Sequence, residues 1–160
     1  MKSSRHTART AAVLVLVLVL GVGLLPGCTL SSPPRLQVSG ARAGPASGNR
    51  GVVLIDVVAT NPNREGLPLK SVVYTVDLGG ERVFEGRRDA QASVRGYGVQ
   101  KITLPVPVSS SYVAGGQTRF RVAGEITYVA PETLAQTLYD NDLRKSSTAF
   151  SGEGVVAAGP

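Results

Sequence analysis

The chain has 160 residues, a net charge of +6 and 42% hydrophobic residues, and this length suits one globular domain. With one cysteine and one histidine, it can form neither an intramolecular disulfide nor a cysteine-based zinc site. A Ser-His-Asp triad would have to use His6, close to the N-terminus. We therefore expect no metal ion, no cofactor and no enzymatic activity.

Residues 1–27 have the pattern of a secretory signal peptide. Lys2, Arg5 and Arg9 form a basic start without acidic residues, and an apolar run follows over residues 11–25. As a helix, this run spans only ~23 Å, less than the ~30 Å hydrocarbon core of a bilayer. It also ends at Pro26-Gly27, which breaks a helix. We therefore favour a signal peptide over a single membrane-spanning helix.

The end of this segment carries a possible lipidation site. Leu25-Pro26-Gly27-Cys28 resembles the lipobox of bacterial lipoproteins, in which the cysteine becomes the mature N-terminus and carries acyl chains. The chain's sole cysteine stands where this motif requires it, and two or three acyl chains anchor a protein stably. Thr29 follows, whereas Asp there retains lipoproteins of enteric bacteria in the inner membrane. The resemblance implies an envelope lipoprotein and favours the outer membrane, facing the periplasm; a stray cysteine in a signal peptide is the alternative.

Cleavage before Cys28 would leave 14 basic and 11 acidic residues, a net charge of +3. Their spread along the chain predicts a mixed-charge surface and no nucleic-acid binding, since no basic stripe is interleaved with aromatic residues. Residues 28–34 would be the acylated cysteine and a short linker, stiffened by Pro33-Pro34, that keeps the following domain near the membrane.

Short strands separated by turns are predicted for the rest of the chain. Leu36–Val38 predicts a weak first strand, and residues 41–50, rich in Gly, Ser, Ala and Pro, predict a loop. Residues 52–60 are nearly continuous in Val, Leu and Ile, which is typical of a buried strand, and Asp56 is their only charge. Asn61-Pro62-Asn63 then ends the strand and turns the chain.

The next two predicted strands form a hairpin. Residues 69–78 alternate, and one face carries Val72, Tyr74, Val76 and Leu78, with Lys70 at its rim. Gly79-Gly80 separates this run from residues 81–85, and both positions of such a two-residue turn need positive φ. Residues 86–98 are polar and are predicted to hold at most one short strand.

Two more alternating runs and a final strand complete the pattern. In residues 101–108 the inward positions are apolar, whereas Pro105 and Pro107 point outward and predict a free strand edge. Residues 119–129 alternate in the same way after a loop at Gly115-Gly116. Residues 131–143, with Leu134 and Leu138 four apart, predict one or two helical turns, and residues 144–156 predict a last strand around Phe150.

About seven short strands in ~120 residues predict an all-β fold, a single antiparallel β-sandwich over residues 35–155. We expect residues 156–160 to be a flexible tail. A domain of this size buries about two-thirds of its unfolded surface, enough to fold without a disulfide.

The order of motifs in residues 52–108 is similar to that of a known family. Val53–Asn63 is a hydrophobic strand ending in Asn-Pro-Asn, and Leu67–Glu81 continues with a Pro-Leu step, an aromatic residue and a Gly turn. Phe84-Glu85-Gly86 and the run Gln100–Val108 follow in the same order. This resembles the late embryogenesis abundant type 2 domain, or WHy (water stress and hypersensitive response) domain, over about residues 35–155. The resemblance implies a fibronectin-type-III-like (immunoglobulin-like) sandwich and a role in desiccation or stress protection, without known catalytic residues, in a family whose bacterial members are often lipoproteins.

Candidate site residues outside the lipobox have plain structural interpretations. Asn61 and Asn63 are expected to fix a turn around Pro62 through bonds to the backbone, rather than to contact a ligand. Gly96-Tyr97-Gly98 lacks the Lys-Ser/Thr ending and the helix of a phosphate loop. Asp140 and Asp142 are expected to be solvated turn residues rather than calcium ligands, and Glu81 and Glu85 imply no acid/base pair.

Two functions of different kinds are compatible with these observations. The leading hypothesis is a non-enzymatic, membrane-anchored lipoprotein that protects envelope components during desiccation or osmotic stress. The alternative is an envelope interaction module that docks a protein or glycan partner through the free strand edge at residues 101–108. The sequence leaves the oligomeric state open.

Overall fold

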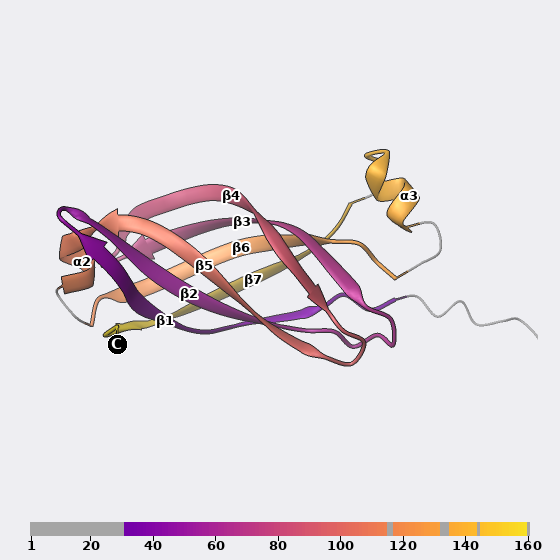
Figure 1. Ribbon diagram of the computed structural model, residues 1–160, viewed down its shortest axis with the longest axis horizontal. Helices are drawn as coiled ribbons and strands as arrows, with labels where there is room; N and C mark the ends of the chain where they lie inside the picture. Colours follow the sequence, from indigo (N-terminus) through magenta and orange to yellow (C-terminus); the bar gives the residue numbers. More distant parts are fainter. Residues whose placement is uncertain (1–30, 115–116, 132–134, 144, 160) are drawn as a thin grey trace, which may run out of the picture. The chain divides into compact units, whose positions relative to one another are not determined.

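Seven β-strands and two short helices make up the fold, which the computed structural model describes over residues 31–114, 117–131, 135–143 and 145–159 (Figure 1). The predicted signal peptide, Cys28, the Gly115-Gly116 loop and Leu134 lie outside the described residues. In chain order the elements are β1 (Arg35–Ser47), β2 (Arg50–Thr60), β3 (Leu67–Leu78), β4 (Glu81–Val94), β5 (Val99–Ser109), α2 (Ser110–Ala114), β6 (Arg119–Tyr128), α3 (Ala135–Asp140) and β7 (Ser146–Ala157).

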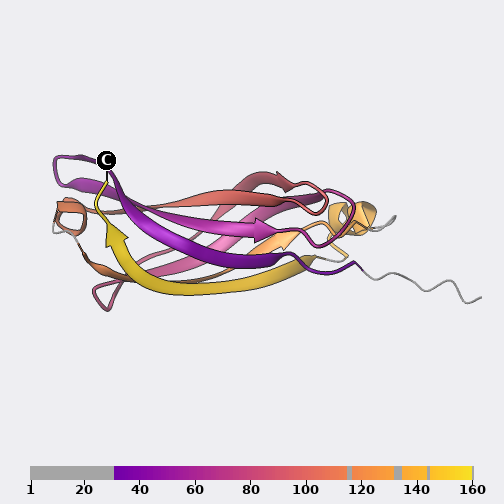
Figure 2. The same cartoon turned by 90° about the horizontal axis from the view of Figure 1, so that it is seen from below.

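The strands form one curled sheet in the order β4-β3-β6-β7-β1-β2-β5. Neighbouring strands are antiparallel except β1 and β7, which pair in parallel at Ala41–Val156 and Arg42–Ala157. The sheet curls until its two terminal strands, β4 and β5, come close together, and its inward face encloses the core (Figures 1 and 2). The predicted all-β class is confirmed, whereas the finer fibronectin-type-III-like sandwich stays a prediction.

The core is built from the alternation that the sequence predicts. Val53, Ile55 and Val57 of β2 are fully buried, and their neighbours along the strand are half-buried. The predicted inward face of β3 is buried, as are Phe120, Val122, Ile126 and Tyr128 of β6, which confirms both assignments. The Gly79-Gly80 hairpin is also confirmed, since both glycines have positive φ, +62° and +93°.

Two strands are longer than predicted. Residues 41–47 belong to β1 instead of a loop, because Ala41 and Ala43 pair with Ile55 and Val53 and are small enough to be buried against them. Strand β4 continues to Val94, although its sequence is polar, because it is a terminal strand with one face in solvent. Tertiary pairing thus overrides weak local strand propensity in both places.

Three smaller corrections concern bulges and ends. A register shift between Leu69 and Ser71 interrupts β3, so Lys70 does not share the face of Val72 but lies over the ring of Tyr139. Strand β7 continues to Ala157, two residues into the predicted tail, where buried Val156 pairs with β1. The short helix α2 was not predicted, whereas α3 lies within the predicted helical segment.

We expect Val72→Asp to destabilise the protein far more than Val73→Asp, although the two residues are adjacent. Val72 is 0% exposed, so a carboxylate there would be buried without a partner at a cost of about 3–5 kcal/mol. Val73 is 45% exposed on the outer face, where the same change should cost less than about 0.5 kcal/mol. Urea unfolding of both variants measures the difference, and equal midpoints would contradict the register of β3.

Candidate functional site

Asn61 is the centre of the Asn-Pro-Asn turn that follows β2. Its side chain is 1% exposed, and its Nδ2 donates to the carbonyls of Glu65, Val94 and Arg95 at 2.7, 3.2 and 3.2 Å. Its Oδ1 accepts from the backbone N–H and the Nδ2 of Asn63, both at 2.9 Å. One buried amide therefore joins the turn after β2 to the chain segment between β4 and β5, which is a structural role without any need for a ligand.

The segment after β4 packs directly on this turn. The Asn61 N–H donates to the Gly98 carbonyl at 3.0 Å, and the Tyr97 N–H donates to the Asn63 carbonyl at 2.8 Å. A Cβ at Gly96 would lie 1.7 Å from the Arg64 carbonyl oxygen, so only glycine allows this approach. Gly96-Tyr97-Gly98 is thus part of a two-turn structure at this end of the sheet.

Asn63 holds the start of the described chain. Its Nδ2 donates to the Ser32 carbonyl, and its Oδ1 accepts from the Ser32 N–H, both at 2.8 Å. An amide that both donates to and accepts from one residue fixes that residue's backbone at two points. The linker expected at residues 28–34 is therefore attached at Ser32 to the same turn that Asn61 organises.

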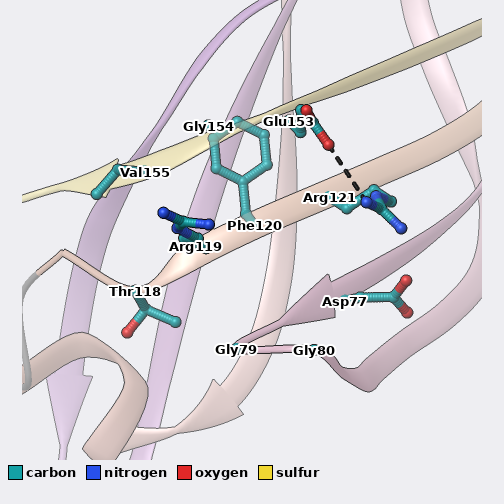
Figure 3. Close-up of a pocket in the computed structure, with 10 residues that line it drawn as sticks. All are labelled: Asp77, Gly79, Gly80, Thr118, Arg119, Phe120, Arg121, Glu153, Gly154 and Val155. Carbon is teal, nitrogen blue, oxygen red and sulfur yellow. Dashed lines mark hydrogen bonds and ion pairs between the residues drawn. The ribbon is translucent and has the colours of Figure 1, made fainter.

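A hollow lies at the opposite end of the sheet, beside the Gly79-Gly80 turn (Figure 3). It measures about 880 Å³, and Asp77, Arg119, Arg121 and Glu153 project around it. Arg82 donates to Asp77 at 3.0 Å, and Arg121 lies 3.4 Å from Glu153. Each carboxylate thus has an arginine partner among solvent-exposed side chains, which suits weak polar contacts rather than acid/base chemistry.

Strand β5 ends the sheet, which confirms the predicted free edge. Tyr74 crosses the interior and donates its O–H to the Pro105 carbonyl at 2.8 Å. Burial raises the pKa of the Tyr74 phenol, although the charge of Arg88 opposes this, so the phenol stays protonated. Pro105 and Pro107 have no N–H group. This stretch therefore offers few partners to an added strand, and its prolines protect the edge.

A second hollow of about 460 Å³ lies where β4 and β5 approach each other. Pro107 and Val108 form one side, and Glu81 and Arg82 form the other. Tyr112 of α2 donates to Glu81 at 3.0 Å across it. This hydrogen bond joins α2, the helix that directly follows β5, to the start of β4.

Asp56, the only charge in β2, organises a polar cluster on the outer face of the sheet. Its carboxylate accepts from Arg42 of β1, from Thr103 of β5 at 2.7 Å and from Lys101 of β5 at 3.4 Å. Partial burial raises the pKa of Asp56, but the Thr103 hydrogen bond and the charges of Arg42 and Lys101 outweigh it, so the net pKa is lowered. The sequence shows the lone charge but not its partners, because the composition of residues 41–50 predicts a loop at Arg42.

The other sequence candidates have separate places in the structure. Leu25, Pro26, Gly27 and Cys28 lie outside the described residues. Asp142 pairs with Lys145 at 2.6 Å after α3, and Glu85 lies 3.8 Å from Arg82. Within the described ranges, no group of three or more His, Cys, Asp or Glu residues is arranged to hold a metal ion. In the same ranges, no helix is long and apolar enough to cross a membrane.

A family model described as late embryogenesis abundant protein (LEA_2) matches residues 56–138. The chain belongs to this late embryogenesis abundant family. The matched segment begins at Asp56 and contains both asparagines of the turn, the β3–β4 hairpin and strands β5 and β6. The protein is thus a stress-related protein of the late embryogenesis abundant type, in a family that is generally non-enzymatic.

Solved structures of low sequence identity share the fold of this chain. The solution structure of AT1g01470 from Arabidopsis thaliana is 14% identical, with a TM-score of 0.58, covering 81% of this chain and 83% of that chain. At2g46140.1, described as a late embryogenesis abundant (LEA) protein, is 15% identical, with a TM-score of 0.54, covering 94% and 87%. ApaA from Bordetella pertussis is 17% identical, with a TM-score of 0.50, covering 80% and 97%. No curated protein matches the chain.

Replacing Asn61 should destabilise the LEA_2 domain. Asn61→Ala removes the donor from three carbonyls and is expected to cost about 2–4 kcal/mol, and Asn61→Asp should cost as much, because it turns a carboxylate oxygen toward those carbonyls. Asn63→Asp, at a more exposed position, is the matched control and should cost about 1 kcal/mol. Chemical denaturation measures all three. An unchanged midpoint for Asn61→Asp would contradict the structural role.

Asp56→Asn should cost about 1–2 kcal/mol of stability at pH 7. Because the folded pKa of Asp56 lies below its ordinary value of 3.8, its stabilising effect is present above that value and is lost as the pH falls through the folded pKa. The stability difference between wild type and variant should therefore close below about pH 4. Glu125→Gln, on the exposed outer face of β6, is the control. A difference that stays constant down to about pH 2 would exclude the carboxylate charge as its source.

Proposed function

We propose that the protein is a non-enzymatic lipoprotein of the bacterial cell envelope that protects envelope components during desiccation or osmotic stress. The family match over residues 56–138 carries this proposal, because it assigns more than half of the chain to a stress-related family. Leu25-Pro26-Gly27-Cys28 supports the lipid anchor and the outer membrane as its location, with the domain facing the periplasm. A fibronectin-type-III-like (immunoglobulin-like) sandwich as the finer fold of the domain is part of the same proposal.

The side chains support a binding or protective role over catalysis. In the 880 Å³ hollow both carboxylates are paired with arginines, and the buried amide of Asn61 is used in bonds to the backbone. A general acid or base needs a proton-accepting group within reach of a bound substrate. The paired carboxylates of this hollow are poor candidates for that role.

Docking of an envelope protein or glycan at the edge of β5 is the second candidate function. Its support is the terminal position of β5 in the sheet. Pro105, Pro107 and the Tyr74 hydrogen bond weigh against strand addition there, so a partner would have to use side chains near the 460 Å³ hollow. Capture of one stoichiometric partner from envelope extracts, lost on Val108→Glu, would favour docking over general protection.

The main proposal is tested by complementing a deletion strain with wild type, Cys28→Ser and Ser147→Ala, the last as a neutral surface control. We expect wild type and Ser147→Ala to incorporate labelled palmitate, to sediment with membranes and to restore survival of drying and osmotic shock. Cys28→Ser should lose the label, the sedimentation with membranes and the restored survival, because Cys28 is the residue that carries the acyl chains. A deletion strain that survives drying like its parent would contradict the protective role, and unlabelled wild type would contradict the anchor.

A further inference from the structure

The end of the sheet that carries the Asn-Pro-Asn turn exposes an unusual combination of side chains. Tyr97 is 73% exposed and Val99 is 66% exposed, and both are among the most exposed large apolar or aromatic side chains of the described residues. Arg64 and Arg95 are exposed on the two adjoining turns, and Arg35 is exposed at the start of β1. We call these five residues, Arg35, Arg64, Arg95, Tyr97 and Val99, the tether-side surface.

Strand register and turn contacts place these residues together. Arg35 pairs with Thr60, and Thr60 pairs with Val99, so the three form one row across β1, β2 and β5. Ala59 points inward, so this row points outward. The Tyr97 N–H bond to Asn63 and the close approach of Gly96 to Arg64 bring the two turns into contact beside the row.

Tyr97 is an unexpected residue for its place. Its φ is +53°, a left-handed conformation that favours glycine or asparagine over a bulky side chain. The ring gains little from burial within the protein, since most of its surface is exposed. Tyrosine combines an apolar ring with a polar tip, which is the property that enriches it at membrane interfaces.

The charges of this surface are unbalanced, in contrast to the hollow at the other end. Among the described residues, Arg35, Arg64 and Arg95 have no carboxylate partner. Glu65, in the Asn-Pro-Asn turn, adds one negative charge next to these three positive ones. At the far end, Asp77 and Glu153 are paired with Arg82 and Arg121. The tether-side surface is therefore the one that complements an anionic partner.

The covalent distance to Cys28 is short. Four peptide steps separate Cys28 from Ser32, a reach of at most ~15 Å, and Asn63 holds Ser32 on the same turn that carries Arg64. The headgroup layer of one leaflet is about 5–8 Å thick. A chain acylated at Cys28 therefore keeps Ser32, on the turn that carries Arg64, within about one Debye length, 8–10 Å, of the headgroups, where charges are not fully screened.

We propose that the tether-side surface lies on the anionic phospholipid headgroups of the membrane that holds the acyl chains, with Tyr97 and Val99 inserted between the headgroups. This proposal rests on the lipid anchor proposed above. The arginines contact lipid phosphates, and the contact orients β3 away from the membrane, so that the Gly79-Gly80 end lies about 36 Å from it. Helix α3 lies at the same end of the sheet, where Asp140 accepts from Gln136 and Asp142 is paired with Lys145 (Figure 1).

The test uses the acylated full chain in vesicles of phosphatidylglycerol and phosphatidylcholine, with lipids that carry a nitroxide on the headgroup. A fluorophore is attached at Glu65→Cys, within the tether-side end, or at Glu153→Cys, at the far end as the matched control. We expect at least about threefold stronger quenching at position 65 than at position 153. Arg64→Glu combined with Arg95→Glu should abolish this difference, whereas Arg50→Glu combined with Arg119→Glu should preserve it.

Flotation with the vesicles reports the anchor separately from the orientation. Floating protein with equal quenching at both positions overturns the membrane-facing surface and leaves the lipid anchor standing. If the difference in quenching between positions 65 and 153 is the same in vesicles of phosphatidylcholine alone as in vesicles with phosphatidylglycerol, the choice of an anionic lipid is overturned. Protein that does not float overturns both the anchor and this inference.

Discussion

The buried amide of Asn61 is the interaction on which the geometry of one whole end of the sheet depends. Its Nδ2 joins carbonyls that lie 4 to 34 residues away along the chain, and its Oδ1 orients Asn63. The loop after β2 and the loop between β4 and β5 are thereby held together as a single unit. Because a buried carbonyl without a donor is costly, these bonds also hold the segment before β3 and the end of β4 against the turn.

Several other features follow from that unit. Asn63, oriented by Asn61, attaches Ser32, so the first described residues follow the turn instead of leaving it. Gly96 allows the close contact that exposes Arg95 and Tyr97 beside Arg64. The outward residues of this end are therefore positioned by buried ones, and a change to Asn61 would disturb the surface as well as the stability.

The curled sheet meets a different constraint at its two terminal strands. An exposed strand edge invites pairing with other chains. Here β4 and β5 lie close to each other, prolines remove two donors from β5, and Tyr74 and Tyr112 make side-chain bonds to β5 and β4. The outer cluster around Asp56 joins β1, β2 and β5 by charge-assisted bonds, which strengthens the half of the sheet that ends at this edge.

Alternation made the strands at residues 69–78, 101–108 and 119–129 predictable from the sequence, because burying one face of a strand requires a period of two. The strand at residues 52–60 was predictable from its nearly continuous run of Val, Leu and Ile. The same holds for the Gly79-Gly80 turn, since positive φ at two positions is cheap only for glycine. The asparagines were identified as turn residues, and the family was identified from their context.

Only the tertiary structure decided where the weak segments belong. Ala41 and Ala43 are strand residues because Ile55 and Val53 lie beside them, and β4 extends through a polar sequence because β3 supplies its ladder. The partners of Asp56 come from strands that are 14 to 47 residues away in the chain. Local sequence determines which face of a strand is apolar, but which strands meet, and therefore which charges and turns share an end, depends on contacts between residues that are distant in the chain.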